Sequence, residues 1–131
     1  MIAVDTNVLV RILVEDDETQ TARAVALLRR ATEAGARVFV PDVAMVETAW
    51  VLRACYGFDR AAIVNALHAL LISAELVFRS GAVLGLALRR YARGKGDFAD
   101  YVLLEQARES HAEPVFTFDV AVTREEGFEA C

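Results

Sequence analysis

Cysteine and histidine are scarce in this sequence, and acidic residues outnumber basic ones. The chain has two cysteines, and with 56% hydrophobic residues it can form a core without disulfide bridges, so we expect reduced thiols. Cys55 lies on an apolar segment and is expected in the core. His68 and His111 are too far apart in the sequence to indicate a catalytic pair or a zinc site. The net charge of −5 excludes a general positive field that would attract nucleic acid.

Long hydrophobic runs are also missing. Charges or turns interrupt the apolar stretches well before the roughly 18 residues that a membrane-spanning helix needs. We therefore expect a soluble, cytoplasmic protein that does not enter a membrane. The chain has 131 residues and no repeats, linkers or low-complexity tracts, so we expect a single domain over residues 1–131.

Short apolar segments alternate with longer segments of helical period. The short segments are rich in Val and Phe, which is typical of buried strands, and they cover residues 2–4, 38–40, 76–78 and 115–118. The spacing of apolar residues predicts helices over residues 6–14, 17–34, 42–56, 59–72, 82–93 and 98–110. Strands that alternate with helices predict an α/β fold, in which helices cover both faces of a central parallel sheet.

Acidic residues follow two of the predicted strands. Asp5 comes directly after the first strand, and Asp119 comes directly after the last one. Ligands of an open parallel sheet bind at the carboxyl ends of the strands, so we expect both carboxylates at the same edge. Taken alone, each residue is better explained as an ordinary helix cap.

Three further acids belong to predicted helices. Glu47 falls inside an apolar stripe, where an acid is uncommon without a partner. The stripe consists of Val43, Val46, Trp50, Val51 and Ala54. Asp97 and Asp100 are three residues apart and share one face at the start of the last predicted helix, where Asp97 is either a cap or a metal ligand. Acids that converge on one rim repel each other, and a divalent cation relieves this. All-oxygen ligation favours Mg²⁺ or Mn²⁺ over zinc.

The densest basic cluster of the chain lies just before these acids. It consists of Arg89, Arg90, Arg93 and Lys95. Such a cluster is usually a solvated helix face. Because this one leads directly into Asp97, a role in positioning phosphate groups is the second interpretation.

The sequence resembles the PIN-domain ribonucleases of the VapC toxin type. The resemblance rests on four segments in the order and spacing of the family, which together cover most of the chain. They are "VDTNVLVR", "VAMVETAWVL" with Glu47, "DFADYVLLEQA" and "TFD". The tail after Asp119 is short, so the last edge strand of such a fold is expected to be truncated or absent. The sheet would then have four or five strands.

The resemblance implies a metal-dependent endoribonuclease. The catalytic acids would be Asp5, Glu47, Asp100 and Asp119, and these four with Asp97 would hold Mg²⁺ or Mn²⁺. Thr6, Asn7 and Thr117 match positions that support the site. Single-stranded or looped RNA would be the substrate, with Arg89, Arg90, Arg93 or Lys95 on its phosphates.

Partners also follow from the resemblance. VapC toxins pair with a small VapB antitoxin that blocks the acids, and they are usually homodimers. Apolar residues of the first helices, Val10, Leu13 and Val14, could receive the antitoxin, although ordinary core packing explains them equally well.

Other protein classes fit the sequence less well. A phosphatase of the haloacid dehalogenase type needs a second acid two residues after the first, and that position is Asn7. A receiver-like signalling domain needs an acidic pair at the first strand and a lysine near the last, and neither is present. A non-catalytic PIN-like scaffold that binds nucleic acid or protein remains the alternative.

Overall fold

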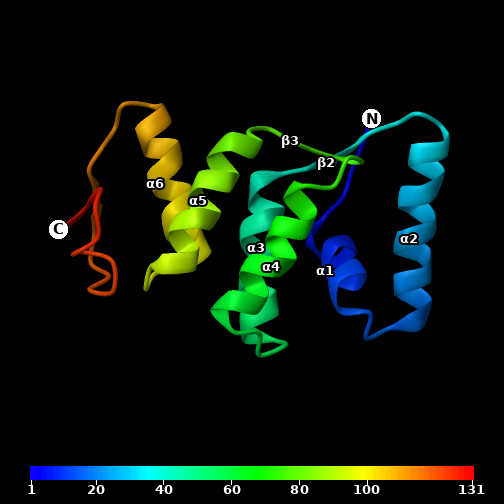
Figure 1. Cartoon of the computed structure of the whole chain (residues 1–131), viewed down its shortest axis with the longest axis horizontal. Helices are drawn as coiled ribbons and strands as arrows, with labels where there is room; N and C mark the ends of the chain where they lie inside the picture. The colour runs from blue at the N-terminus through cyan, green and yellow to red at the C-terminus, as the bar shows by residue number, and fades with distance from the viewer. The chain divides into compact units, whose positions relative to one another are not determined.

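The computed structural model describes residues 1–131 as two compact units, Met1–Gly81 and Ala82–Cys131 (Figure 1). The first unit contains strands β1 (Ile2–Ala3), β2 (Val38–Val40) and β3 (Leu76–Phe78) with helices α1 (Thr6–Val14), α2 (Glu18–Glu33), α3 (Asp42–Ala54) and α4 (Arg60–Leu71). The second contains helices α5 (Gly81–Arg93) and α6 (Phe98–Glu109) with strands β4 (Val115–Thr117) and β5 (Phe128–Ala130). No helix is both long and apolar enough to cross a membrane.

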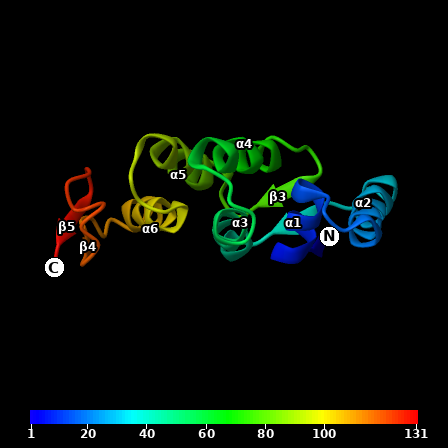
Figure 2. The ribbon, with the colours of Figure 1, turned by 90° about the horizontal axis from the view of Figure 1, so that it is seen from below.

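The first unit is built on a three-stranded parallel sheet with the order β1-β2-β3. Ile2 pairs with Val38, and Val38 pairs with Leu76. Val38 and Val40 of the central strand are fully buried, as expected for a strand covered on both faces. In Figure 2, β3 lies between α4 and α1. This agrees with the predicted α/β layering.

Three helices of the first unit begin at aspartates. The side chains of Asp5, Asp17 and Asp59 accept hydrogen bonds from the backbone N–H groups of Val8, Gln20 and Ala62 at 3.2, 3.0 and 2.8 Å. Each bond satisfies a donor that has no partner in the first turn of a helix. The predicted start sites of α1, α2 and α4 are therefore confirmed to within one residue.

The second unit packs α5 and α6 around an aromatic core. Tyr91 contacts Phe98 and Tyr101 edge to face at ring distances of 6.0 and 6.4 Å, and Tyr101 contacts Phe128 at 6.3 Å. Edge-to-face contact suits aromatic pairs because the positive ring edge meets the negative face of its neighbour. Tyr101 therefore joins α6 to β5.

The predicted sheet of four or five strands is wrong in its strand number. The main sheet has three strands, and β4 and β5 form a separate two-stranded parallel sheet in the second unit. The last strand was also expected to be truncated or absent, yet β5 is present over Phe128–Ala130. Charged residues precede it and only one large apolar residue, Phe128, marks it, so its hydrophobic pattern is weak.

The buried face of α3 differs from the predicted stripe. The buried residues are Ala44, Met45, Thr48, Ala49 and Leu52. Val43 and Trp50, which the stripe placed in the core, are 68% and 64% exposed. The helix carries apolar residues on nearly every side, so periodicity did not select a face. The buried face is the one that meets the rest of the first unit, including α1, which packs against α3.

Two smaller expectations have different outcomes. Both cysteines are free, as predicted, but Cys55 is exposed rather than in the core because it lies just beyond the end of α3. Val10 is buried with 4% of its surface exposed, which confirms the core interpretation of this residue. Leu13 and Val14 are partly exposed.

A polar network joins α1 to the end of α3. Arg11 Nη1 donates to Asp16 Oδ1 at 2.8 Å and to Tyr56 Oη at 3.1 Å, and Tyr56 Oη donates to Asp16 Oδ2 at 2.9 Å. The hydrogen bond from Tyr56 lowers the pKa of Asp16, and the charge of Arg11 adds to this effect. The folded chain therefore binds the Asp16 proton more weakly than the unfolded chain does. Stability from this group is present above the unfolded pKa and is lost as the pH falls through the folded pKa.

We expect the substitution Tyr56→Phe to move the pKa of Asp16 back toward its ordinary value. The loss of stability on acidification should then become smaller. Carboxyl carbon NMR titration of Asp16 checks the first effect, and urea unfolding at neutral pH and at about pH 3 checks the second. An unchanged Asp16 titration in the variant would contradict the role of Tyr56.

Candidate functional site

Asp5 stands at the start of α1 with its neighbours Thr6 and Asn7. The Asp5 backbone is extended, and its Oδ1 accepts the N–H of Val8 at 3.2 Å. Thr6 is buried, while Asp5 and Asn7 are exposed. The cap interpretation of Asp5 is therefore correct. It does not conflict with a ligand role, because one carboxylate can accept a hydrogen bond and bind a cation together.

Glu47 lies on the exposed face of α3, beside Val43 and Trp50. Its position in the apolar stripe predicted a buried face, where an acid would need a partner. Exposure removes that argument, because a solvated glutamate needs no partner. The remaining basis for its functional role is its match to the acidic quartet of VapC-type proteins.

Asp97 and Asp100 are joined at the start of α6. Asp97 is the N-cap residue, and its backbone N–H donates to Asp100 Oδ2 at 2.8 Å. This is the reciprocal half of a capping box, in which the residue three positions into the helix reaches back to the cap. The bond fixes the rotamer of Asp100 in the first turn of α6.

Asp119 is held in the turn that follows β4. Its backbone N–H donates to Thr117 Oγ1 at 2.9 Å, and its Oδ1 accepts the N–H of Ala121 at 2.9 Å. Thr117 thus fixes the backbone on which the Asp119 carboxylate stands. This gives Thr117 a specific supporting contact.

The surroundings of Asp100 raise the pKa of its carboxyl group. Partial burial raises its pKa, and the negative charges of Asp97, Asp119 and Glu125 raise it further, while the hydrogen bond from the Asp97 backbone lowers it. Like charges raise a carboxyl pKa only when they lie close by. The charges of Asp97, Asp119 and Glu125 thus all act on Asp100, and we call these four residues the Asp100 cluster.

The predicted acids are divided between the two units. Asp5 and Glu47 belong to the first, and Asp97, Asp100 and Asp119 belong to the second. No three His, Cys, Asp or Glu side chains are assembled as a metal site. The acids of the second unit nevertheless fit Mg²⁺ or Mn²⁺ chemically, because their donors are carboxylate oxygens and the repulsion felt by Asp100 would be relieved by a cation.

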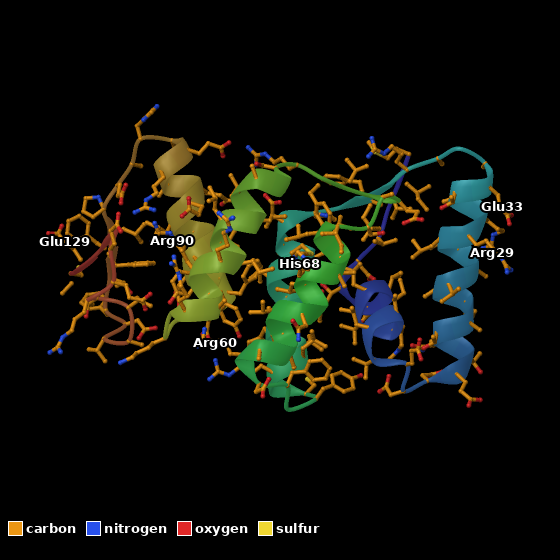
Figure 3. All side chains as sticks on the ribbon, viewed as in Figure 1. Arg29, Glu33, Arg60, His68, Arg90 and Glu129 are labelled. Carbon is orange, nitrogen blue, oxygen red and sulfur yellow. The ribbon has the colours of Figure 1, made fainter.

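The four predicted phosphate contacts differ in their surroundings. Arg89, Arg93 and Lys95 are exposed. Arg90, labelled in Figure 3, donates from Nε to Glu105 Oε1 at 2.8 Å, and Glu105 is buried. Arg90 is thus already engaged in the protein interior. The role of these residues on RNA stays a prediction.

Glu125 and Tyr101 were not among the residues predicted from the sequence. Glu125 lies in the charged tail, where no spacing separates a functional acid from a solvated one. Tyr101 belongs to the apolar face of α6 and resembles any core aromatic. The two glycines around Lys95 were a usable signal, because glycine often marks a place where another group approaches the backbone closely.

We expect the substitution Asp119→Asn to lower the pKa of Asp100, because it removes one of the nearby negative charges. Carboxyl carbon NMR titration of the metal-free chain measures this shift. Glu129→Gln is the control, since Glu129 is an exposed acid of the same unit (Figure 3) and is not among the charges that raise the pKa of Asp100. Equal Asp100 titrations in the wild type and Asp119→Asn would contradict the cluster.

Comparison with known proteins identifies a family. Residues 2–125 match the PIN domain family, so the match includes all the predicted site residues. No curated protein matches the chain. PIN domains are generally metal-dependent nucleases, and they typically use divalent metal ions.

Proposed function

Since the chain belongs to the PIN domain family, we propose that it is a Mg²⁺- or Mn²⁺-dependent endoribonuclease of the VapC type. It would hydrolyse RNA phosphodiester bonds as the toxin of a type II toxin–antitoxin pair. The observation that carries the proposal is the acid set. Asp5, Glu47, Asp100 and Asp119 all lie within the matched residues 2–125 and match the quartet of VapC-type proteins.

The acids have distinct local supports. The cation would be held by Asp5, Asp100 and Asp119, with Glu47 and Asp97 as further ligands. When bound, it would lower the pKa of a bound water, which then serves as the nucleophile, and it would neutralise charge that develops on the phosphate. The chain contributes orientation through three hydrogen bonds: Val8 N–H to Asp5, Asp97 N–H to Asp100, and Asp119 N–H to Thr117.

RNA recognition would rest on local rather than overall charge. The net charge is −5, so a general field cannot draw RNA to the protein. Arg89, Arg93 and Lys95 are exposed cations in the segment that leads into Asp97 and Asp100. Contacts from these residues to phosphates would position a single-stranded or looped RNA. Such a substrate would be met in the cytoplasm.

A groove between α1 and α2 supports the antitoxin proposal. It has a volume of about 630 Å³ and its lining combines apolar residues such as Val8 and Leu27 with Arg11, Arg23 and Arg30. A VapB-type segment with apolar and acidic side chains would fit this chemistry. Asn7, which follows Asp5 by two residues in the sequence, also lines the groove. A segment bound in the groove would therefore lie near Asp5.

We also propose a homodimer. The exposed apolar residues Val43 and Trp50 support it, because they lie seven positions apart on one face of α3 and large exposed apolar side chains favour association. Analytical ultracentrifugation of the purified chain measures its mass in solution. A monomer at micromolar concentration would contradict the proposal.

The test of function is cleavage of a mixed pool of structured and unstructured RNAs by the purified chain. We expect cutting with Mg²⁺ or Mn²⁺, none with EDTA, and none by Asp5→Asn, in which the asparagine can still cap α1. Cleavage that persists in EDTA or in Asp5→Asn would overturn the mechanism. RNA binding without any cleavage would instead identify a non-catalytic scaffold.

A further inference from the structure

The turn formed by Gly94, Lys95 and Gly96, which we call the GKG turn, connects α5 to the start of α6. Two of its backbone N–H groups donate to side chains. Gly96 N–H donates to Tyr101 Oη at 2.9 Å, and Lys95 N–H donates to Glu125 Oε2 at 3.2 Å. Tyr101 belongs to α6, and Glu125 belongs to the segment between β4 and β5. Two distant parts of the second unit thus hold one turn.

Glu125 and Tyr101 are also bonded to each other. Tyr101 Oη donates to Glu125 at 2.8 Å from Oε1 and 2.9 Å from Oε2. The phenol accepts from Gly96 and donates to Glu125, so it uses both of its hydrogen-bonding capacities. Both oxygens of Glu125 are engaged within the protein. A carboxylate with these commitments is suited to holding other groups in place rather than to binding a cation itself.

The two glycines make this arrangement possible. A Cβ at Gly94 would collide with the Tyr101 hydroxyl and would lie 2.7 Å from Glu125 Oε1. A Cβ at Gly96 would lie 2.5 Å from Val122 Cγ1 and 2.8 Å from Asp100 Oδ2. Any side chain at either position would displace the groups that hold the turn. The contact at Gly96 also shows that the turn packs directly against the Asp100 carboxylate.

We infer that Glu125, acting through Tyr101 and the GKG turn, is a positioning residue for the acidic site. The turn ends at Asp97, whose N–H donates to Asp100 Oδ2 at 2.8 Å. Glu125 holds the backbone of Lys95 directly and that of Gly96 through Tyr101. It therefore fixes the backbone from which the Lys95 side chain and the Asp97 carboxylate project. This role rests on the proposed function, in which Asp97 and Asp100 hold the cation and Lys95 contacts phosphate.

Three full-length single variants, together with the double variant Glu125→Gln/Tyr101→Phe, test this role. Glu125→Gln keeps the size of the side chain, but it leaves one oxygen to serve the two donors from Lys95 and Tyr101. Tyr101→Phe keeps the buried ring and removes the hydroxyl that links Gly96 to Glu125. Glu126→Gln is the matched control, because it makes the same change one residue away at a side chain that is 82% exposed.

The first readout is amide hydrogen exchange, measured by NMR. Exchange at Lys95 and Gly96 should become at least about tenfold faster in Glu125→Gln, and exchange at Gly96 should do so in Tyr101→Phe. The second readout is Mn²⁺ affinity measured by calorimetry, which should fall by about 10-fold or more, as when groups that orient metal ligands are removed. Glu126→Gln should leave both readouts unchanged. If Glu125 and Tyr101 act as one unit, the Mn²⁺ affinity of the double variant should be no lower than that of the single variant with the lower affinity.

The outcomes separate this inference from the proposed function. If the wild type binds Mn²⁺ but cuts no RNA, and Glu125→Gln binds Mn²⁺ more weakly, the nuclease proposal is overturned and the positioning role is supported. Metal-dependent cleavage with equal Mn²⁺ affinity and equal amide exchange in Glu125→Gln would overturn the positioning role alone. Independent, additive effects of the two substitutions would also overturn it. A wild type that binds no Mn²⁺ would overturn both.

Discussion

RNA cleavage by Asp100→Asn is expected to fall by more than about 10²-fold, while the folded state stays as stable as in the wild type or becomes more stable. Both effects follow from the position of Asp100. Its carboxylate is partly buried beside Asp97, Asp119 and Glu125, and these surroundings raise its pKa. The raised pKa means that ionising Asp100 costs more in the folded chain than in the unfolded chain, so an amide at this position removes repulsion. Asparagine also keeps an oxygen that can accept the N–H of Asp97.

The measurements are the cleavage rate in Mg²⁺ or Mn²⁺ and the urea unfolding midpoint of the metal-free chain. Asp59→Asn is the matched control. Asp59 caps α4 through a 2.8 Å bond to the Ala62 N–H, asparagine caps equally well, and Asp59 is not among the predicted site acids. Full activity in Asp100→Asn would remove Asp100 from the mechanism. Lower stability without any loss of cleavage would contradict both parts of the prediction.

The substitution Glu105→Ala should destabilise the chain by about 2–3 kcal/mol. Glu105 is only 7% exposed on α6, and its Oε1 accepts from Arg90 Nε at 2.8 Å and from Arg108 Nη1 at 3.3 Å. Removing one member of a buried ion pair leaves its partners without compensation, which typically costs 3–5 kcal/mol. Arg90 and Arg108 keep 24% and 22% of their side-chain surface exposed, so water takes over part of the lost contacts. We therefore place the effect below that range.

Urea unfolding of the full chain, followed by circular dichroism, gives this change in stability. Glu109→Ala makes the same substitution on the exposed face of the same helix and should change stability by less than about 0.5 kcal/mol. Equal effects of the two substitutions would show that the buried contacts of Glu105 add nothing. The Arg108 side chain also pairs with Glu113 at 2.9 Å, so the arginine keeps one partner in the variant.

Local signals predicted the elements of the fold well. The boundaries of α1 follow from Asp5 and the apolar run after it, and those of α4 follow from Asp59, because a cap and the turn it begins are adjacent in the sequence. Strand pairing is different in kind, since it joins segments far apart in the chain. The four-letter run "VFTF" predicts β4 correctly, yet nothing in it shows that β4 pairs with β5 rather than with another strand.

The same limit applies to the site. Asp97, Asp100 and Asp119 were found because they stand at the ends of predicted elements. Glu125 joins them through folding of the segment between β4 and β5, which has no periodic pattern. Glu47 was predicted for the wrong reason, because α3 is apolar on most sides and its buried face is set by tertiary packing, including the contact with α1.

The two exposed, free cysteines make the chain ready for spectroscopic labelling. Cys55 belongs to the first unit and Cys131 to the second, so thiol-reactive probes place one label in each unit without mutagenesis. A pair of spin labels or fluorophores at these positions reports the separation of the units in solution. The predicted acids are divided between the same two units, with Asp5 in one and Asp100 in the other. The change in label separation on adding Mn²⁺ therefore shows whether the ion alters the distance between the units that carry the predicted ligands.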